Sequence, residues 1–341
     1  MKTRPPTSFD VAALAGVSQP TVSLAVRDSP RVSAETRARI LRIAREIGYV
    51  PDRRAMRLRG ARTRCIALVI LLPDDLKPRE VNPLYWDLIA AIETAAAARG
   101  YRILLSLQPN GSDRNCDFEA ERDADGTIVL GSVSAEQGWA RFAALNAEGR
   151  RIVAWGAPDM RIPSIRCDNR AAGALAAGHL IAGGCRRVAF IGPGHAHHVA
   201  YQDRRTGCAV RLAEAGLELI DVDQAATGPR EAQGRAAIEG LLESGTRFDG
   251  VFAAGDLLAI GALSALRDRG LAVPEDVAVI GFDGIRSSAH ARPSLSTVEQ
   301  DTEAAGRMLV AALLRRIDDQ PAEDADVPVN LRQRASSRSP G

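Results

Sequence analysis

The chain begins with three short segments in which hydrophobic residues recur at helical spacing. In the first, Thr7 is a suitable N-cap, and Asp10 stands three positions later in the acidic position of a capping box. Val11, Leu14 and Ala15 then fall on one face. A glycine follows at once and permits a sharp turn. The pattern predicts a short helix that packs through one face and ends in a tight turn.

The second and third segments extend this pattern into a three-helix unit. Ser18 is placed to cap the second helix, where Pro20 is tolerated because amides of the first turn have no intrahelical partner. Val22 and Val26 are expected to face inward, which turns the polar side chains partly outward. A third helix is expected within residues 33–48, from a serine cap to a glycine stop. Such a unit, with a polar second helix, fits the DNA major groove; an ordinary small helical bundle is the alternative.

From residue 65 onward, buried strands alternate with Ala-rich helical stretches. Apolar runs without polar alternation predict parallel strands at CIALVILL, YRILLSL, GTIVLG, RRIVAW, RRVAFIG, FDGVFAAG and EDVAVIGFDG. Repeated βαβ units predict helix-covered parallel sheets with ligands at the carboxyl ends of the strands. The 277 residues after residue 64 are too many for a single hydrophobic core and suit two lobes better. The expected fold is a small all-α helix-turn-helix domain followed by an α/β domain with parallel sheets.

Charge is distributed unevenly along the chain. Residues 1–64 contain 14 Lys/Arg and 5 Asp/Glu, whereas the remaining 277 residues contain 30 and 37. A whole-chain charge of +2 therefore conceals a basic amino-terminal part and an acidic body. Positive charge confined to the first domain is what a protein needs if only that domain neutralises DNA phosphates. The distribution therefore favours DNA as a partner of the first domain.

The chain resembles the LacI/GalR family of transcriptional regulators. The matching segments, in order, are DVAALAGVSQPTVSLAV, VSAETRARI, IGYVPD, NPLYWDLIAAIE, RCDN, FDGVFAAGDLLAIGAL, VPEDVAVIGFDGI and PSLSTVEQD. The resemblance covers almost the whole chain. It implies a helix-turn-helix domain at 1–50, a hinge helix or linker at 51–61, and a two-lobed, periplasmic-binding-protein-like body at 62–341.

The resemblance also implies how the body is divided. One lobe is expected at about 62–163 and 293–322, and the other at about 164–292 and 323–336. Between residues 107 and 126 the chain is shorter than the family pattern and strongly charged. The helix that the family has there is expected to be short or lost.

Base-reading roles are implied by the resemblance for Gln19, Pro20 and Leu24. An amide can reach an adenine edge and a leucine can touch a thymine methyl, whereas proline donates no hydrogen bond. The expected phosphate contacts are hydroxyls that can equally cap helices, namely Thr7, Ser18, Thr21 and Ser23.

Residues 51–60 resemble the family's hinge helix. Isolated helices shorter than about 12–15 residues are marginal in water, so this one is expected to form when two copies meet on DNA. Leu58 would then insert between base steps in the minor groove, with Arg54 and Arg57 near phosphates. A flexible basic linker is the alternative.

An effector site between the lobes is also implied by the resemblance. Carboxylates and a guanidinium can bind paired hydroxyls, and an aromatic ring can pack on the apolar face of a sugar. The simpler alternatives are that Asp168 caps the following helix and that Asp283 only ends a strand. The expected contacts are Asn82, Leu84 and Tyr85 from the first lobe, Asp168, Arg204, Asp256 and Asp283 from the second, and Gln300 near the crossing strands.

Other candidate chemistry is weak. His195, His197 and His198 follow a strand, but no carboxylate or cysteine stands at informative spacing, so we expect no metal and no cofactor. Effector contact and exposed loop histidines are both open. The 5 cysteines are scattered without Cys-x-x-Cys spacing, as in a cytoplasmic protein with reduced, mostly buried thiols. A polar amino terminus and the lack of a membrane-length apolar run also favour a cytoplasmic protein.

The sequence therefore predicts a non-enzymatic transcriptional regulator. Repression is the expected output, through a homodimer that binds a palindromic operator and responds to a sugar-like effector. Two alternatives come from other classes. One is an enzyme with an appended DNA-binding domain, although no catalytic motif is visible. The other is an architectural DNA-binding protein that takes no ligand.

Overall fold

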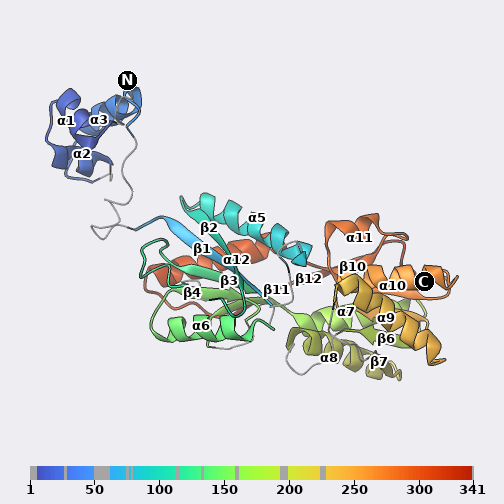
Figure 1. Cartoon of the computed structure of the whole chain (residues 1–341). Coiled ribbons are helices and arrows are strands. Elements are labelled where there is room, and N and C mark those ends of the chain that lie inside the picture. Colours follow the sequence, from blue (N-terminus) through green and yellow to red (C-terminus); the bar gives the residue numbers. More distant parts are fainter. Residues whose placement is uncertain are drawn as a thin grey trace. The chain divides into compact units, whose positions relative to one another are not determined.

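The chain folds into two compact units, Met1–Thr63 and Arg64–Gly341 (Figure 1). The computed structural model describes residues 6–26, 29–49, 62–73, 77, 80–112, 116–131, 134–157, 161–192, 199–222 and 228–339.

The first unit contains the three expected helices, α1 (Ser8–Ala15), α2 (Gln19–Val26) and α3 (Ala34–Glu46). The capping box that opens α1 is present: the Thr7 backbone N–H donates to Asp10 Oδ2 over 2.7 Å. A glycine with φ of 64° ends the same helix and allows the sharp turn into α2. Local sequence signals therefore define this unit.

The core of the first unit differs in two positions from the expected inward faces. It comprises Val11, Ala12, Ala15, Val22, Ala25, Val32, Ile40 and Ala44. Leu14 is 62% exposed, so its expected inward orientation is wrong. In α2, Ala25 is buried, whereas Val26 only packs against the edge of the core. Val11, Ala15 and Val22 are buried as expected. Because α1 and α2 each contact both other helices of the unit, a small residue beside the expected positions, Ala12 or Ala25, is buried as well.

The second unit is built on two sheets, each with six described strands. The order in sheet A is β11 (Ala325–Val327), β5 (Ser164–Cys167), β4 (Ile152–Trp155), β3 (Thr127–Gly131), β1 (Cys65–Leu72), β2 (Arg102–Pro109). The order in sheet B is β12 (Val329–Arg332), β10 (Ser296–Gln300), β9 (Ala278–Asp283), β8 (Gly250–Ala253), β6 (Val188–Ile191), β7 (Leu219–Val222). Among these strands only the β10–β12 pair is antiparallel. The expected parallel sheets are confirmed.

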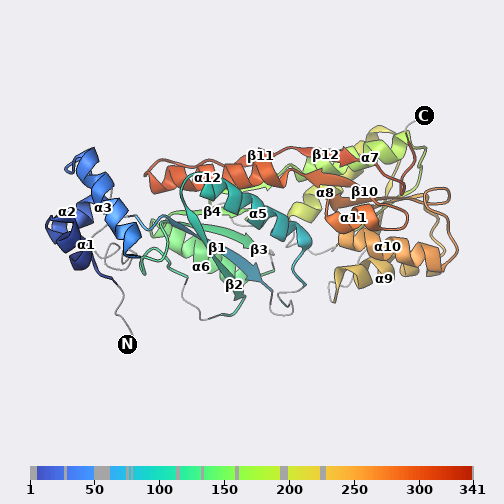
Figure 2. The ribbon, with the colours of Figure 1, turned by 90° about the horizontal axis from the view of Figure 1, so that it is seen from above.

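Helices cover both faces of sheet A. Because β1 is buried along its whole length, its alternating side chains serve two cores. Leu68 and Ile70 share a hydrophobic cluster with residues of α5 (Pro83–Ala97) and α12 (Thr302–Ile317). Val69 and Leu71 share another cluster with residues of α6 (Glu136–Ala147). Figure 1 shows α5 and α6 on opposite sides of the sheet, and Figure 2 shows α12 running beside α5.

The helices of the other lobe pack in close pairs. They are α7 (Asn169–Ala182) with α8 (Val199–Glu214), and α9 (Arg230–Glu243) with α10 (Asp256–Asp268); the short α11 (Arg286–His290) follows β9. A Cβ at Gly173 would lie 1.9 Å from the Arg204 carbonyl oxygen, and one at Gly234 would lie 1.9 Å from that of Leu258. Only glycine permits so close an approach, which sets the positions of α8 and α10.

The chain changes sheets three times, after β5, after β10 and after β11. These points differ by several residues from the expected lobe boundaries. β5 (164–167) and β11 (325–327) pair within sheet A, and β10 (296–300) pairs within sheet B. The difference arises because each crossing segment first extends the sheet that it is about to leave. A short apolar strand does not reveal which sheet it joins.

Between β2 and β3 the described residues form turns and no helix, in line with the short segment there. Asp117 and Glu119 of this segment form ion pairs with Arg150 and Arg151. Among the described residues, no single helix is long and apolar enough to cross a membrane; α1 and α2 meet that length and composition test only as a pair, bent by 103°.

Candidate functional site

Helix α2 carries the residues expected to meet DNA. Val22 and Ala25 are buried in the core that α2 shares with α1 and α3. Pro20 is exposed, and Gln19, Thr21, Ser23 and Leu24 are half-buried. Leu24 also packs against the edge of the core. The helix therefore presents a mixed polar and apolar surface, as major-groove recognition requires.

Two of the four hydroxyl groups expected at phosphates, those of Thr7 and Ser18, also cap helices. Ser18 Oγ accepts from the Thr21 backbone N–H at 3.3 Å and is hydrogen-bonded to the Thr21 hydroxyl at 2.8 Å. Thr7 caps α1. Gln19 Nε2 donates to Ser8 Oγ at 3.2 Å, which ties α2 to the start of α1 and leaves the amide oxygen as an acceptor. Ser18 is exposed, so capping leaves it accessible to a phosphate.

The carboxylate of Asp283, at the end of β9, accepts hydrogen bonds from side chains of both lobes. Asn82 Nδ2, from the lobe of sheet A, donates to Oδ2 at 2.8 Å, and Gln300 Nε2 donates to Oδ1 at 2.8 Å. The backbone of Asp283 has φ of 114°, a conformation that costs a non-glycine residue roughly 1–3 kcal/mol. Such strain is retained where the surroundings determine the conformation, so Asp283 does more than end a strand.

Arg204, on α8, lies within electrostatic range of this carboxylate and is 8% exposed. Its Nε donates to Asn169 Oδ1 at 2.7 Å, and its Nη1 donates to the Ala254 carbonyl oxygen. The guanidinium carbon lies 3.7 Å from the ring centre of Phe282 and 4.9 Å from that of Tyr201. Two hydrogen bonds and two aromatic faces therefore hold the cation in one orientation.

Two tyrosines and a second arginine complete the group. Tyr85, on α5, donates its hydroxyl proton to the Gly131 carbonyl oxygen at 3.0 Å. Burial, and then Tyr201 and Asp283, raise the Tyr85 pKa, while Arg204 and Arg230 oppose that rise. Tyr85 therefore remains a neutral donor within electrostatic range of the other lobe. We term the whole set the interlobe cluster: Asn82, Tyr85, Tyr201, Arg204, Arg230, Asp283 and Gln300.

Asp256, at the start of α10, differs from Asp283 although both were expected at the effector. It is 0% exposed. Thr297 Oγ1 donates to Oδ1 at 2.7 Å, and the Ile285 backbone N–H donates to Oδ2 at 2.9 Å. Burial and then the nearby Asp283 raise its pKa well above the ordinary value. Both oxygens are satisfied inside the lobe, which argues for a structural role rather than direct ligand contact.

Two other expected contacts have local roles. Asp168 is exposed and caps α7, with Oδ1 accepting from the Ala171 backbone N–H at 2.8 Å. Leu84 is buried, 6% exposed, in the first turn of α5. Asp168 therefore fits the simpler alternative of a helix cap, and Leu84 is a buried core residue of the sheet A lobe.

Known protein families match both the DNA-binding domain and the two-lobed domain of the chain. The model of bacterial regulatory proteins of the lacI family matches residues 9–52, and the model of the periplasmic binding protein-like domain matches residues 177–337. The HTH-type transcriptional regulator CelR of Thermobifida fusca is 34% identical over 334 residues, which cover 96% of this chain and 95% of CelR. The chain belongs to the LacI family. It is a ligand-responsive, DNA-binding transcriptional regulator.

Other LacI-family proteins are similar over nearly the full length. The HTH-type transcriptional repressor PurR of Serratia proteamaculans is 30% identical, over 94% of this chain and 93% of PurR. A CelR–cellobiose complex has 30% identity and a TM-score of 0.65, covering 97% of this chain and 99% of that one. A lac repressor dimer bound to operator and anti-inducer shares the fold, with a TM-score of 0.75 at 24% identity, covering 98% and 99%. These relatives are regulators of transcription.

In this LacI-family regulator the tertiary structure brings together Asn82, Tyr85, Arg204, Asp283 and Gln300 from the expected effector set. The cluster also contains Tyr201 and Arg230, which were not predicted from the sequence as effector contacts. Tyr201 stands three residues before Arg204 on α8, a helical spacing that could have indicated stacking. Arg230 gave no such signal, since it reaches the cluster only through the position of α9.

Several expected functional residues lie outside the described part of the chain. They are Arg54, Arg57 and Leu58 of the hinge segment and His195, His197 and His198. The 5 cysteines are free thiols, and all but Cys116 are buried.

Proposed function

We propose that this LacI-family protein is a homodimeric repressor whose affinity for a palindromic operator depends on a sugar-like effector bound at the interlobe cluster. The observation that carries the proposal is the convergence of side chains from both lobes on Asp283. A ligand can shift a conformational equilibrium only through different contacts in its two states. Groups contributed by both lobes supply such contacts, because relative motion of the lobes changes them.

For DNA, we propose that α2 enters the major groove. Gln19 and Leu24 would contact base edges, while Pro20 offers only apolar contact. The hydroxyls of Thr7, Ser18, Thr21 and Ser23 would meet phosphates in addition to their local roles. We also propose that Leu58 inserts between base steps in the minor groove, with Arg54 and Arg57 at phosphates.

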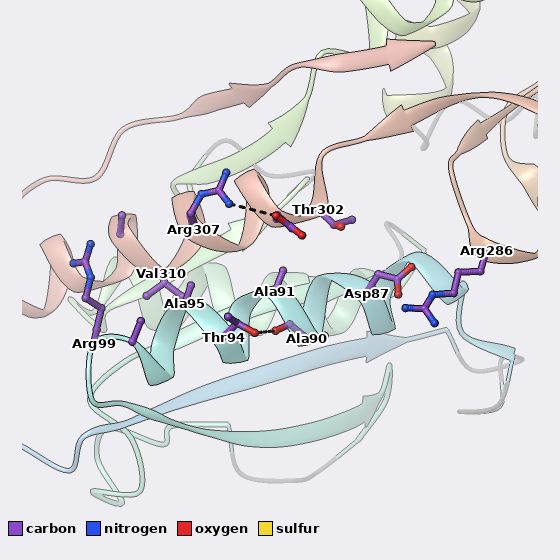
Figure 3. A pocket seen from close by; sticks show the side chains of 13 residues that line it. Asp87, Ala90, Ala91, Thr94, Ala95, Arg99, Arg286, Thr302, Arg307 and Val310 are labelled. Atoms are coloured by element: carbon purple, nitrogen blue, oxygen red, sulfur yellow. Dashed lines mark hydrogen bonds and ion pairs between the residues drawn. The ribbon is translucent and has the colours of Figure 1, made fainter. Parts of the chain in front are cut away.

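For the dimer, we propose the face formed by α5 and β2. A groove of about 730 Å³ runs between α5 and α12, with a floor of alanines and charged residues at its rim (Figure 3). Trp86, on α5, is 44% exposed, and Leu105, on β2 at the edge of sheet A, is 41% exposed. Exposed apolar side chains beside an unpaired strand edge are what subunit association covers.

For the effector, we propose a polyhydroxylated ligand, by analogy with the CelR–cellobiose complex. The Asp283 carboxylate and the Arg204 guanidinium would bind hydroxyls, with Tyr85 and Tyr201 beside the ring. Ligand binding would then change the arrangement of the lobes, and with it the spacing of the two DNA-binding domains. We further propose that the protein has no catalytic turnover and acts in the cytoplasm, where the DNA is.

The test is operator binding by the full-length protein, measured by fluorescence anisotropy on fragments from its own upstream region. Gln19→Ala and Leu24→Ala should each weaken specific binding by about 1–3 kcal/mol at a single base pair, while Gln137→Ala on the exposed face of α6 should not. Effector and operator must alter each other's affinity by the same factor. Equal effector affinity with and without saturating operator would refute the coupling.

A further inference from the structure

The interlobe cluster contains two guanidinium groups that face the same aromatic ring. The Arg204 guanidinium carbon lies 4.9 Å from the ring centre of Tyr201, and that of Arg230 lies 5.9 Å from it. Arg204 comes from α8 and Arg230 begins α9. Two cations from different helices therefore gather around one side chain.

Neither cation has a carboxylate partner among the residues that the structure describes. Other arginines of the same lobe do: Arg205, next to Arg204, pairs with Asp221, and Arg170 pairs with Asp203 at 2.8 Å. Arg204 is nevertheless 8% exposed, and burying a charge without a counterion is costly. Stacking on aromatic rings offsets only part of that cost.

Hydrogen-bonding capacity also remains. Arg204 uses Nε and Nη1, and within the described chain no acceptor meets Nη2. Arg230 uses Nη1, which donates to Gln233 Oε1 at 3.0 Å. The remaining N–H groups of both side chains can serve a ligand, and a guanidinium prefers a carboxylate or phosphate for that purpose.

The carboxylate in the cluster does not neutralise both cations. Asp283 accepts from two neutral amides, Asn82 and Gln300, at 2.8 Å each, and forms no ion pair with Arg204 or Arg230 among the described residues. Burial raises its pKa, although the two arginines and both amides oppose the rise. One negative charge against two positive ones leaves the cluster with a net positive charge.

We infer that Arg230, together with Arg204, makes the interlobe cluster select an effector that carries an anionic group, a carboxylate or a phosphate, on a polyhydroxylated body. This inference rests on the proposed effector site and adds the charge of the ligand to it. The hydroxyl groups of the ligand then bind to Asp283, Asn82 and Gln300. Its anionic group binds to the two guanidinium groups. Arg230 is the specificity-determining residue, because without its charge the cluster would contain one cation and one carboxylate and would have no net charge.

The test compares ligands that differ only in charge. The full-length protein is titrated calorimetrically with glucose, glucuronate and glucose 6-phosphate, with the corresponding galactose series, and with cellobiose and cellobionate. Inorganic phosphate is added as a minimal probe, scored by its effect on thermal unfolding against chloride at equal ionic strength. Each measurement is repeated for Arg230→Gln, Arg230→Lys and Arg211→Gln. Arg211 is a matched control, since it lies on α8 with a side chain that is 41% exposed.

The expected result is that an anionic member binds at least about ten-fold more tightly than its neutral counterpart, a difference of about 1.4 kcal/mol. Arg230→Gln should abolish that preference, Arg230→Lys should keep part of it, and Arg211→Gln should leave it intact. The carboxylate and phosphate arms tell which anion is preferred. If no anionic probe, phosphate included, distinguishes the unsubstituted protein from Arg230→Gln, the inference is overturned.

Repeating the operator-binding assay in the presence of the same ligands separates this inference from the proposed function. If a neutral sugar alters operator affinity and its anionic counterpart binds no better, the ligand charge is wrong and the effector site stands. If no compound of either charge alters operator affinity, and none binds, both proposals fail together.

Discussion

Replacing Asp256 by alanine should destabilise the lobe of sheet B more than any surface change. The carboxylate accepts hydrogen bonds from Thr297 Oγ1 and the Ile285 backbone N–H, and the Gly284 backbone also contributes. Thr297 lies 41 residues away and belongs to β10. Asp256 therefore joins the start of α10 to the turn after β9 and to a neighbouring strand. Alanine removes that junction and leaves its donors buried.

The magnitude follows from the orphaned donors. Each buried donor left without an acceptor costs about 1–3 kcal/mol. The Thr297 hydroxyl can rotate toward the Val298 carbonyl oxygen, 3.5 Å away, so the two backbone amides dominate. Burial also raises the Asp256 pKa, which means that the ionised carboxyl itself carries a cost that alanine relieves. A net loss of about 2–4 kcal/mol remains after that relief.

The assay is thermal unfolding of the full-length protein, followed by circular dichroism. For a lobe of this size, each kcal/mol lowers Tm by roughly 2–4 °C. Asp256→Asn keeps a carbonyl acceptor and should lose less. Asp268→Asn is the matched control, because it lies on the same helix with its side chain 49% exposed and should stay within about 1 kcal/mol. If Asp256→Ala unfolds as the control does, the hydrogen bonds do not stabilise the lobe.

Three other predictions concern packing, pH and the effector. Gly234→Ala should cost about 3 kcal/mol or more because its Cβ would lie 1.9 Å from a backbone oxygen of α10, whereas Gly240→Ala, with open space around it, should stabilise α9 by about 0.5–1 kcal/mol; equal denaturation midpoints would contradict this. Burial lowers the pKa of His179, so the unfolded chain takes up the proton first as pH falls below 6.5. Stability should therefore fall with decreasing pH, by at most about 1.4 kcal/mol per unit, and His179→Gln should flatten the profile; parallel profiles would exclude His179 as the cause. Asn82→Ala should weaken effector binding about ten-fold, since it removes a hydrogen bond to the Asp283 carboxylate, and Asn82→Ser, which keeps a capping oxygen for α5, should weaken it similarly; unchanged calorimetric affinity in both would oppose a binding role.

Much of the architecture follows from short-range signals. The capping box at Thr7, the glycine turn after α1 and the uninterrupted apolar run of β1 are local, and each formed as expected. A capping hydrogen bond spans three residues and a buried strand is recognisable from its own eight. Composition alone also separated a basic first domain from an acidic body.

The different roles of Asp256 and Asp283 could not be predicted from short-range sequence signals. Asp256 comes shortly after β8 and Asp283 is the last residue of β9, and the resemblance to the LacI/GalR family implies an effector contact for both. In the folded chain their surroundings differ. Asp256 accepts a hydrogen bond from the Thr297 hydroxyl on β10 and is fully buried. Asp283 accepts a hydrogen bond from Asn82, which is 201 residues away and in the other lobe. Arg230 reaches the cluster in the same way, through the placement of α9. Caps, turns and strand propensity act over a few residues and can be read along the chain. Which charges end up buried, paired or facing a ligand depends on contacts between distant segments, and those exist only once the sheets and helices have packed.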